Sequence, residues 1–138
     1  RRCLIPADGF YEWSAVAGRR RKQPYAIRFT GEEPLAFAGI WDRWQGMVGA
    51  EPRVTCAILT CPPNEAVAPV HDRMPVVLAD EQAMARWLDP DADPEALRVL
   101  LGPLPAAKTI IYPVSERVND PRADEPELLE PVEPVDPA

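Results

Sequence analysis

The chain contains one histidine, His71, in the stretch APVHDRMPVVL. Histidine is the only side chain whose unperturbed pKa, about 6.5, lies close to neutral pH, so His71 is the first candidate for proton transfer. It stands where a loop is expected to enter a strand, a position that often presents functional side chains, and Arg73 could hold an anion beside it. In the alternative reading, Asp72 and Arg73 pair on the surface and His71 only packs.

A second candidate is Glu12, which stands between Tyr11 and Trp13 in the stretch GFYEW. The two-residue period of a strand places Glu12 on the face opposite these aromatic side chains, together with Phe10. If that face belongs to the core, an apolar setting favours the protonated carboxyl group and makes Glu12 a proton carrier. If the face is solvated, Glu12 has no special role, and the sequence leaves both readings open.

Other residue types offer weaker candidates. Tryptophans can stack on unpaired bases, but Trp41 and Trp87 are expected in the core. The basic run at residues 19–22 could contact phosphates, although a hairpin tip of like charge is usually solvated. The three cysteines lie in apolar strand contexts, which predicts reduced, unreactive thiols and no disulfide. One histidine and no C-x-x-C motif argue against a metal site, and no cofactor is expected.

The elements that must position these residues are mostly strands. The Asp8-Gly9 pair predicts a tight hairpin between a strand ending at Ala7 and a strand starting at Phe10. Asn64 is a plausible N-cap for about two helical turns that lead to His71. Further strands are predicted over residues 25–30, 35–44, 53–61, 74–78 and 108–115, with 53–61 central, and helices within 79–90 and 93–101. The fold class is therefore α+β, with a mainly antiparallel, barrel-like sheet and two or three short helices.

Length and charge set further bounds. The chain has 138 residues, which suits a single domain, and a net charge of −7. Residues 1–75 hold ten Lys and Arg against eight Asp and Glu, whereas residues 76–138 hold five against fourteen. Any nucleic-acid binding is thus expected at a local site rather than over the whole surface. No membrane span and no secretion signal are apparent, which predicts a cytoplasmic protein with no membrane partner.

Five stretches, taken in order, resemble the SOS response-associated peptidase (SRAP) family: RRCLIPADGFYEW, KQPYAI, AFAGIWDRW, TCAILTCPPNEAVAPVHDRMPVVL and YPVSERVND. The resemblance covers about residues 1 to 120. It implies a protein that binds abasic sites in single-stranded DNA. In this family an N-terminal cysteine, exposed by autoproteolytic removal of the initiator Met, condenses with the sugar aldehyde to give a thiazolidine crosslink.

The resemblance also implies roles for individual residues. His71 matches the histidine that opens the abasic sugar and moves protons, and Glu12 matches the glutamate that orients the cysteine amine. Arg73 and Thr60 match positions that contact DNA. The partner implied is single-stranded DNA with abasic sites, bound by a monomer that joins the nucleoid during DNA damage.

The sequence departs from the family pattern in one respect. The Cys-Gly-Arg opening and the Asn-Ala-Arg motif of the family do not occur in it, and Cys3 lies inside a strand motif instead. Residues 1–118 are therefore expected to be a partial SRAP domain without its N-terminal segment, inactive as a peptidase or lyase alone, followed by a Pro- and acid-rich tail at 119–138. The alternatives are a non-covalent single-stranded DNA-binding module and a thiol peptidase.

Overall fold

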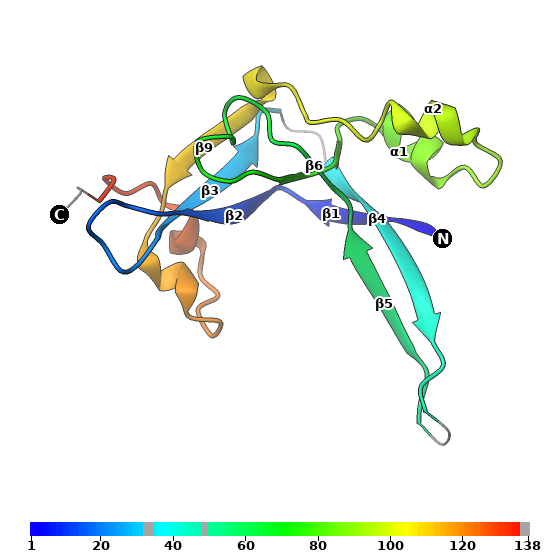
Figure 1. Ribbon diagram of the computed structural model, residues 1–138, viewed down its shortest axis with the longest axis horizontal. Helices are drawn as coiled ribbons and strands as arrows, with labels where there is room; N and C mark the ends of the chain where they lie inside the picture. Colours follow the sequence, from blue (N-terminus) through cyan, green and yellow to red (C-terminus); the bar gives the residue numbers. More distant parts are fainter. Residues whose placement is uncertain (32–34, 48–49, 136–138) are drawn as a thin grey trace. The chain divides into compact units, whose positions relative to one another are not determined.

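The computed structural model describes residues 1–31, 35–47 and 50–135 and separates into two compact units (Figure 1). Unit 1 comprises Arg1–Asp8, Glu32–Pro62 and Met74–Leu104. Unit 2 comprises Gly9–Gly31, Pro63–Arg73 and Pro105–Ala138. Each unit is thus assembled from three segments that are distant in sequence.

The strands of unit 1 form an antiparallel sheet in the order β1-β4-β5, with β8 also pairing with β4, and a separate two-stranded pairing of β6 with β7. Their bounds are β1 (Arg2–Ala7), β4 (Leu35–Trp44), β5 (Arg53–Ile58), β6 (Thr60–Cys61), β7 (Met74–Pro75) and β8 (Val77–Leu78). Gly39 lies opposite Cys3, and a Cβ at Gly39 would come within 2.8 Å of the Cys3 sulfur. The close approach of β1 and β4 therefore needs glycine there.

Two α-helices complete unit 1, α1 (Glu81–Leu88) and α2 (Pro94–Arg98), and both lie where the sequence predicts them. The Asp80 carboxylate accepts the Ala83 N–H at 2.7 Å and caps α1. The buried Trp87 indole donates to the Cys3 carbonyl at 3.0 Å and so ties α1 to β1. The Arg2 guanidinium donates to carbonyls at the end of α1, those of Trp87 and Asp89, and thereby satisfies groups that the helix leaves open.

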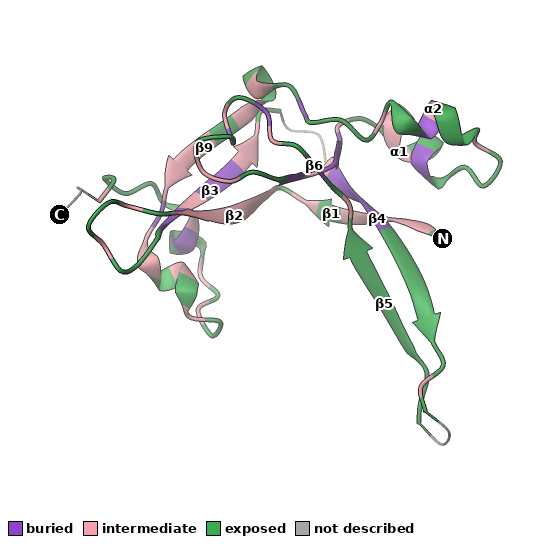
Figure 2. Ribbon diagram, in the orientation of Figure 1, coloured by how far each residue is buried: buried purple, intermediate pink, exposed green. Residues whose placement is uncertain are grey.

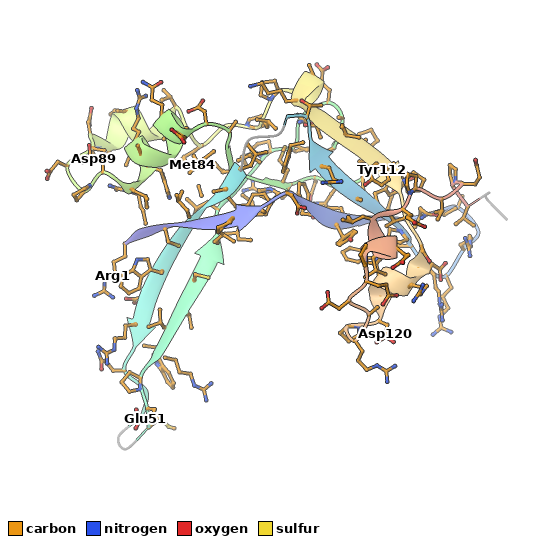
Figure 3. The ribbon with its side chains drawn as sticks, turned by 180° about the vertical axis from the view of Figure 1, so that it is seen from behind. Arg1, Glu51, Met84, Asp89, Tyr112 and Asp120 are labelled. Atoms are coloured by element: carbon orange, nitrogen blue, oxygen red, sulfur yellow. The ribbon has the colours of Figure 1, made fainter. Side chains whose placement is uncertain are left out.

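The hairpin of β4 and β5 is more exposed than the sequence suggests. β5 is exposed along its whole length, as is β4 from Ile40 onward (Figure 2), so the expectation that residues 53–61 form a central strand is wrong. Trp41 is 38% exposed and is not a core residue. Within the described residues, β1 and β8 pair with β4 only up to Ile40. Beyond Ile40, β4 has β5 as its strand neighbour, so both strands stay exposed. The guanidinium carbon of Arg1, a residue labelled in Figure 3, lies 5.0 Å from the centroid of the exposed Trp41 ring.

Unit 2 is built on a second antiparallel sheet in the order β2-β3-β9. Its strands are β2 (Gly9–Ser14), β3 (Gln23–Phe29) and β9 (Thr109–Pro113), and its short 3₁₀ helices are η1 (Ala106–Lys108), η2 (Glu116–Asn119) and η3 (Pro126–Leu129). Ile27, Val67 and Val114 are fully buried in this unit. Together the two units confirm the α+β class with mainly antiparallel pairing, and none of the described sheets closes into a barrel.

The predicted hairpin at Asp8-Gly9 is not formed. β1 pairs with β4, and β2 pairs with β3, so the chain bends at Asp8 and continues. Gly9 does not have the positive φ that such a turn requires. It serves instead for close approach, because a Cβ at Gly9 would lie 2.6 Å from the Ile27 carbonyl oxygen.

The Pro- and acid-rich segment after Asn119 contains a short helix and a β-bridge. Leu128 in η3 is buried, and Val114 forms a β-bridge with Pro131. At the end of η2, the half-buried Asp120 (Figure 3) accepts two hydrogen bonds from the Arg122 guanidinium, at 2.9 and 3.0 Å. These bonds lower the pKa of Asp120.

The contacts of Trp87 predict a large stability effect. Trp87→Ala should lower the free energy of unfolding by about 3 to 5 kcal/mol, because it removes a buried ring and leaves a cavity. Leu88→Ala, at a side chain that is 47% exposed, should cost less than about 0.5 kcal/mol. Urea unfolding of both variants tests this, and equal losses would contradict the packing of α1 described above.

Candidate proton-transfer site around His71

His71 lies at the end of the segment 63–73, whose backbone forms successive hydrogen-bonded turns at residues 65–70. The two helical turns expected here do not form a regular helix. Pro69 contributes to this, because it has no N–H to donate to a helical hydrogen bond. The predicted cap is confirmed, since the Asn64 side-chain oxygen accepts the N–H groups of Ala66 and Val67 at 3.1 and 3.0 Å. Val67 in turn accepts the backbone N–H of His71 at 3.0 Å.

The structure brings Glu12 and His71 together. Glu12 lies on β2 opposite Tyr25 of β3, and its carboxylate Oε2 lies 3.8 Å from the His71 Nε2. This separation is too long for a hydrogen bond and falls within the range of an ion pair. The Glu12 side chain is 23% exposed and that of His71 38%. The face that holds Glu12 is therefore neither dry core nor open solvent, so both earlier readings of Glu12 are replaced by a half-buried carboxylate beside an imidazole.

The other ring nitrogen of His71 faces the backbone of Arg73. The Arg73 N–H donates to Nδ1 at 3.1 Å, and the Arg73 carbonyl oxygen also lies 3.1 Å from Nδ1. A neutral ring that accepts the N–H carries its proton on Nε2, toward Glu12. A doubly protonated ring can donate from Nδ1 to the carbonyl, while the Asp72 carboxylate lies 3.4 Å away. Partners are thus in place for His71 in both protonation states.

The two expected DNA-contacting residues have different settings. Arg73 directly follows the His71 turn in unit 2 and is exposed. Thr60 belongs to unit 1, where it is exposed on β6 opposite Pro75 of β7. The structure therefore joins His71, Glu12 and the Arg73 backbone in one cluster, whereas Thr60 lies on a different unit.

Two residues of this region were not foreseen as contributors. Asn64 was predicted only as a cap, and Thr109 on β9 was not singled out. The Asn64 amide group donates to the Thr109 hydroxyl at 2.9 Å, so the turn that carries His71 is tied to the sheet. No local sequence signal indicates this contact, because Asn64 and Thr109 lie on segments far apart in the chain.

The basic run at residues 19–22 is partly paired rather than simply solvated. Arg19 and Arg21 contact the Glu116 carboxylate at 3.5 and 3.0 Å. Beside them, an open pocket of about 530 Å³ is lined by Trp13, Arg21, Lys22, Glu116, Asn119 and Asp120. Two carboxylates in this lining offset its cationic character.

In ranges 1–31, 35–47 and 50–135, no group of three or more His, Cys, Asp or Glu side chains is arranged to hold a metal ion. None of the helices in this part of the chain has the length and apolar character needed to cross a membrane.

The fold and site define a small α+β protein in which a histidine on a loop approaches a carboxylate on an antiparallel sheet. Comparison with known proteins gives the family. Residues 1–121 match the family described as SOS response associated peptidase (SRAP), and the chain belongs to that family.

Its relatives include proteins named for abasic-site processing. The abasic site processing protein YoqW of Bacillus subtilis is 43% identical over 131 residues, covering 94% of this chain and 57% of that protein. The abasic site processing protein HMCES of Gallus gallus is 37% identical over 153 residues, covering 96% of this chain and 44% of that protein. The chain thus spans about half the length of the curated relatives it matches.

Solved structures agree with the fold. A crystal structure of a protein from Bacteroides thetaiotaomicron matches with a TM-score of 0.86 at 26% identity, covering 96% of this chain and 57% of that one. A phage-related protein from Bordetella bronchiseptica matches with a TM-score of 0.60 at 37% identity, covering 83% and 54%.

The contacts of Nδ1 predict the tautomer of the free imidazole. At alkaline pH, where histidine is neutral, the proton should reside on Nε2, because Nδ1 accepts the Arg73 N–H. Long-range ¹H–¹⁵N correlation spectra can test this without assignment ambiguity, because the chain has only one histidine. A protonated Nδ1 under these conditions would contradict the proposed hydrogen bond.

Proposed function

We propose that this chain supplies the proton-transfer residues of a protein that processes abasic sites in single-stranded DNA. The observation that supports this most directly is the approach of the Glu12 carboxylate to the His71 imidazole, at 3.8 Å, in a chain of the SRAP family. The names of its relatives supply the substrate class, since YoqW and HMCES are both called abasic site processing proteins.

In the proposed chemistry, His71 is the general acid and base. The abasic sugar is mostly a closed hemiacetal, and opening it moves a proton from the anomeric hydroxyl to the ring oxygen. The Nε2 atom of His71, on the side of the ring that faces Glu12, can donate a proton to the sugar or accept one from it. The Glu12 carboxylate lies 3.8 Å from the same atom and can orient the ring.

The covalent step needs an aminothiol. In the reaction that the family resemblance implies, the amine of an N-terminal cysteine adds to the sugar aldehyde and loses water to form an imine. The thiolate then adds to the imine carbon and closes a thiazolidine, so one water is released overall. Cys3 is not proposed for this role, because it lies within β1, paired with Gly39.

The DNA would be held by cationic and polar groups on the surface. Arg73 follows His71 by two residues, so a phosphate bound by its guanidinium would place the lesion near the imidazole. Thr60 is exposed and carries a hydroxyl that can donate to a phosphate oxygen. These contacts fix position rather than base sequence, as expected for a protein that recognises a site without a base.

A crosslinking assay tests the role of the pair. The full-length product of the gene should form a heat-stable adduct with a single-stranded oligonucleotide that holds one abasic site. His71→Ala should slow adduct formation by about 10² to 10⁴, the usual effect of losing a general acid or base. Glu12→Gln should also slow it, whereas Glu65→Gln, at an exposed carboxylate on the His71 turn, should not.

Two outcomes of this assay would count against the proposal. If the full-length protein forms no adduct, covalent processing fails. If His71→Ala reacts at the normal rate, His71 is not the proton-transfer residue.

Salt dependence tests the role of Arg73. Arg73→Gln should weaken non-covalent binding to single-stranded DNA regardless of sequence and reduce the slope of log Kd against log salt by about one. Arg98→Gln, an exposed arginine on α2 paired with Glu95, should leave the slope unchanged. Fluorescence anisotropy at several salt concentrations measures both slopes. Binding without any covalent product would favour the non-covalent module instead.

A further inference from the structure

Asn64 is one of the few buried polar residues among those described, with 8% of its surface exposed. Both polar atoms of its side chain form hydrogen bonds. The oxygen accepts the N–H groups of Ala66 and Val67, at 3.1 and 3.0 Å, and the amide nitrogen donates to the Thr109 hydroxyl at 2.9 Å. Thr109 is the first residue of β9, so Asn64 joins the turn to the sheet of unit 2.

The turn passes this constraint on to His71. Val67 is fully buried, and its carbonyl accepts the N–H groups of Val70 and His71 at 2.8 and 3.0 Å. The Val67 N–H is itself held by the Asn64 side chain. A path of hydrogen bonds therefore leads from Thr109 on β9 through the buried Asn64 and Val67 to the backbone of His71, whose imidazole lies 3.8 Å from the Glu12 carboxylate.

The orientation of the Asn64 amide is also fixed. The N–H groups of Ala66 and Val67 can only donate, so the amide oxygen must face them, and the NH₂ group is then turned toward the Thr109 hydroxyl. Removing the side chain would leave these N–H groups without this partner, and because Val67 is fully buried, the cost favours rearrangement of the backbone. A rearranged turn would move the imidazole relative to the Glu12 carboxylate on β2.

We propose that Asn64 is a positioning residue for His71: it holds the 64–70 turn against Thr109 and thereby sets the imidazole beside the Glu12 carboxylate. The effect of Asn64 on catalysis rests on the proposed function. Its effect on the position of the imidazole does not, and can be tested separately. Because Asn64 is argued to act through the backbone of the turn, substrate binding should not depend on it.

Three variants test the proposal. Asn64→Ala removes both the oxygen that accepts from the turn and the amide nitrogen that donates to Thr109. Asn64→Asp keeps the acceptor oxygens, and the Thr109 hydroxyl can rotate to donate to the carboxylate, so it is the conservative rescue. Val114→Ala removes core volume from the same unit without touching the turn, and so controls for loss of stability alone.

The first readout is the NMR spectrum of the imidazole in this chain, where His71 gives the only histidine signals. Asn64→Ala should change the ¹H and ¹⁵N shifts of the ring and its tautomer balance while the protein remains folded. Asn64→Asp and Val114→Ala should keep the wild-type pattern. An unchanged imidazole spectrum in folded Asn64→Ala would overturn the proposal.

The second readout is the adduct-forming rate of the full-length gene product. Asn64→Ala should slow the covalent step by about 10- to 10²-fold, the scale expected for a misplaced catalytic group, with unchanged Kd for the oligonucleotide. Asn64→Asp should restore most of the rate. An equal loss in Val114→Ala would show a general stability effect and overturn the proposal. If no protein forms adducts but the NMR change is seen, positioning by Asn64 holds and the proposed function fails.

Discussion

The approach of the Glu12 carboxylate to the His71 imidazole is the interaction on which the candidate site depends. The two side chains come from segments far apart in the sequence. Glu12 is placed by the register of β2 with β3, and His71 by the turn that Asn64 ties to β9. Because the two side chains remain partly exposed, the attraction between them is screened by water, and its value lies in orientation more than in stability. An imidazole with partners on both nitrogens is well suited to gain and lose a proton without moving.

All groups that define this cluster belong to unit 2, although they come from three separate segments of the chain. The sheet β2-β3-β9 supplies a rigid base, and the buried Val67 fixes the turn above it. Unit 1 has a different character. There the α1 helix is fastened to β1 through Trp87 and Arg2, while the β4–β5 hairpin carries exposed tryptophans on strands with few partners among the described residues.

Membership of the SRAP family gives these features a chemical context. The relatives are about twice as long as this chain, and the chain contains His71, Glu12 and Arg73. The histidine–carboxylate pair forms within the residues that the structure describes. Cys3 is not proposed as the aminothiol that the reaction requires, because it lies within β1 and pairs with Gly39 of β4.

The sequence by itself determined the features that depend on local signals. Asp80 and the spacing of apolar residues predict α1, and residue type with motif identifies His71 and Glu12 as candidates. The tertiary structure alone decided which strands pair, because the Asp8-Gly9 signal is local whereas the pairings of β1 with β4 and of β2 with β3 arise from distant segments. It also decided the exposure of β5, the contact of Asn64 with Thr109 and the distance between Glu12 and His71. Each of these depends on residues far apart in the chain, whose packing energy no short stretch of sequence contains.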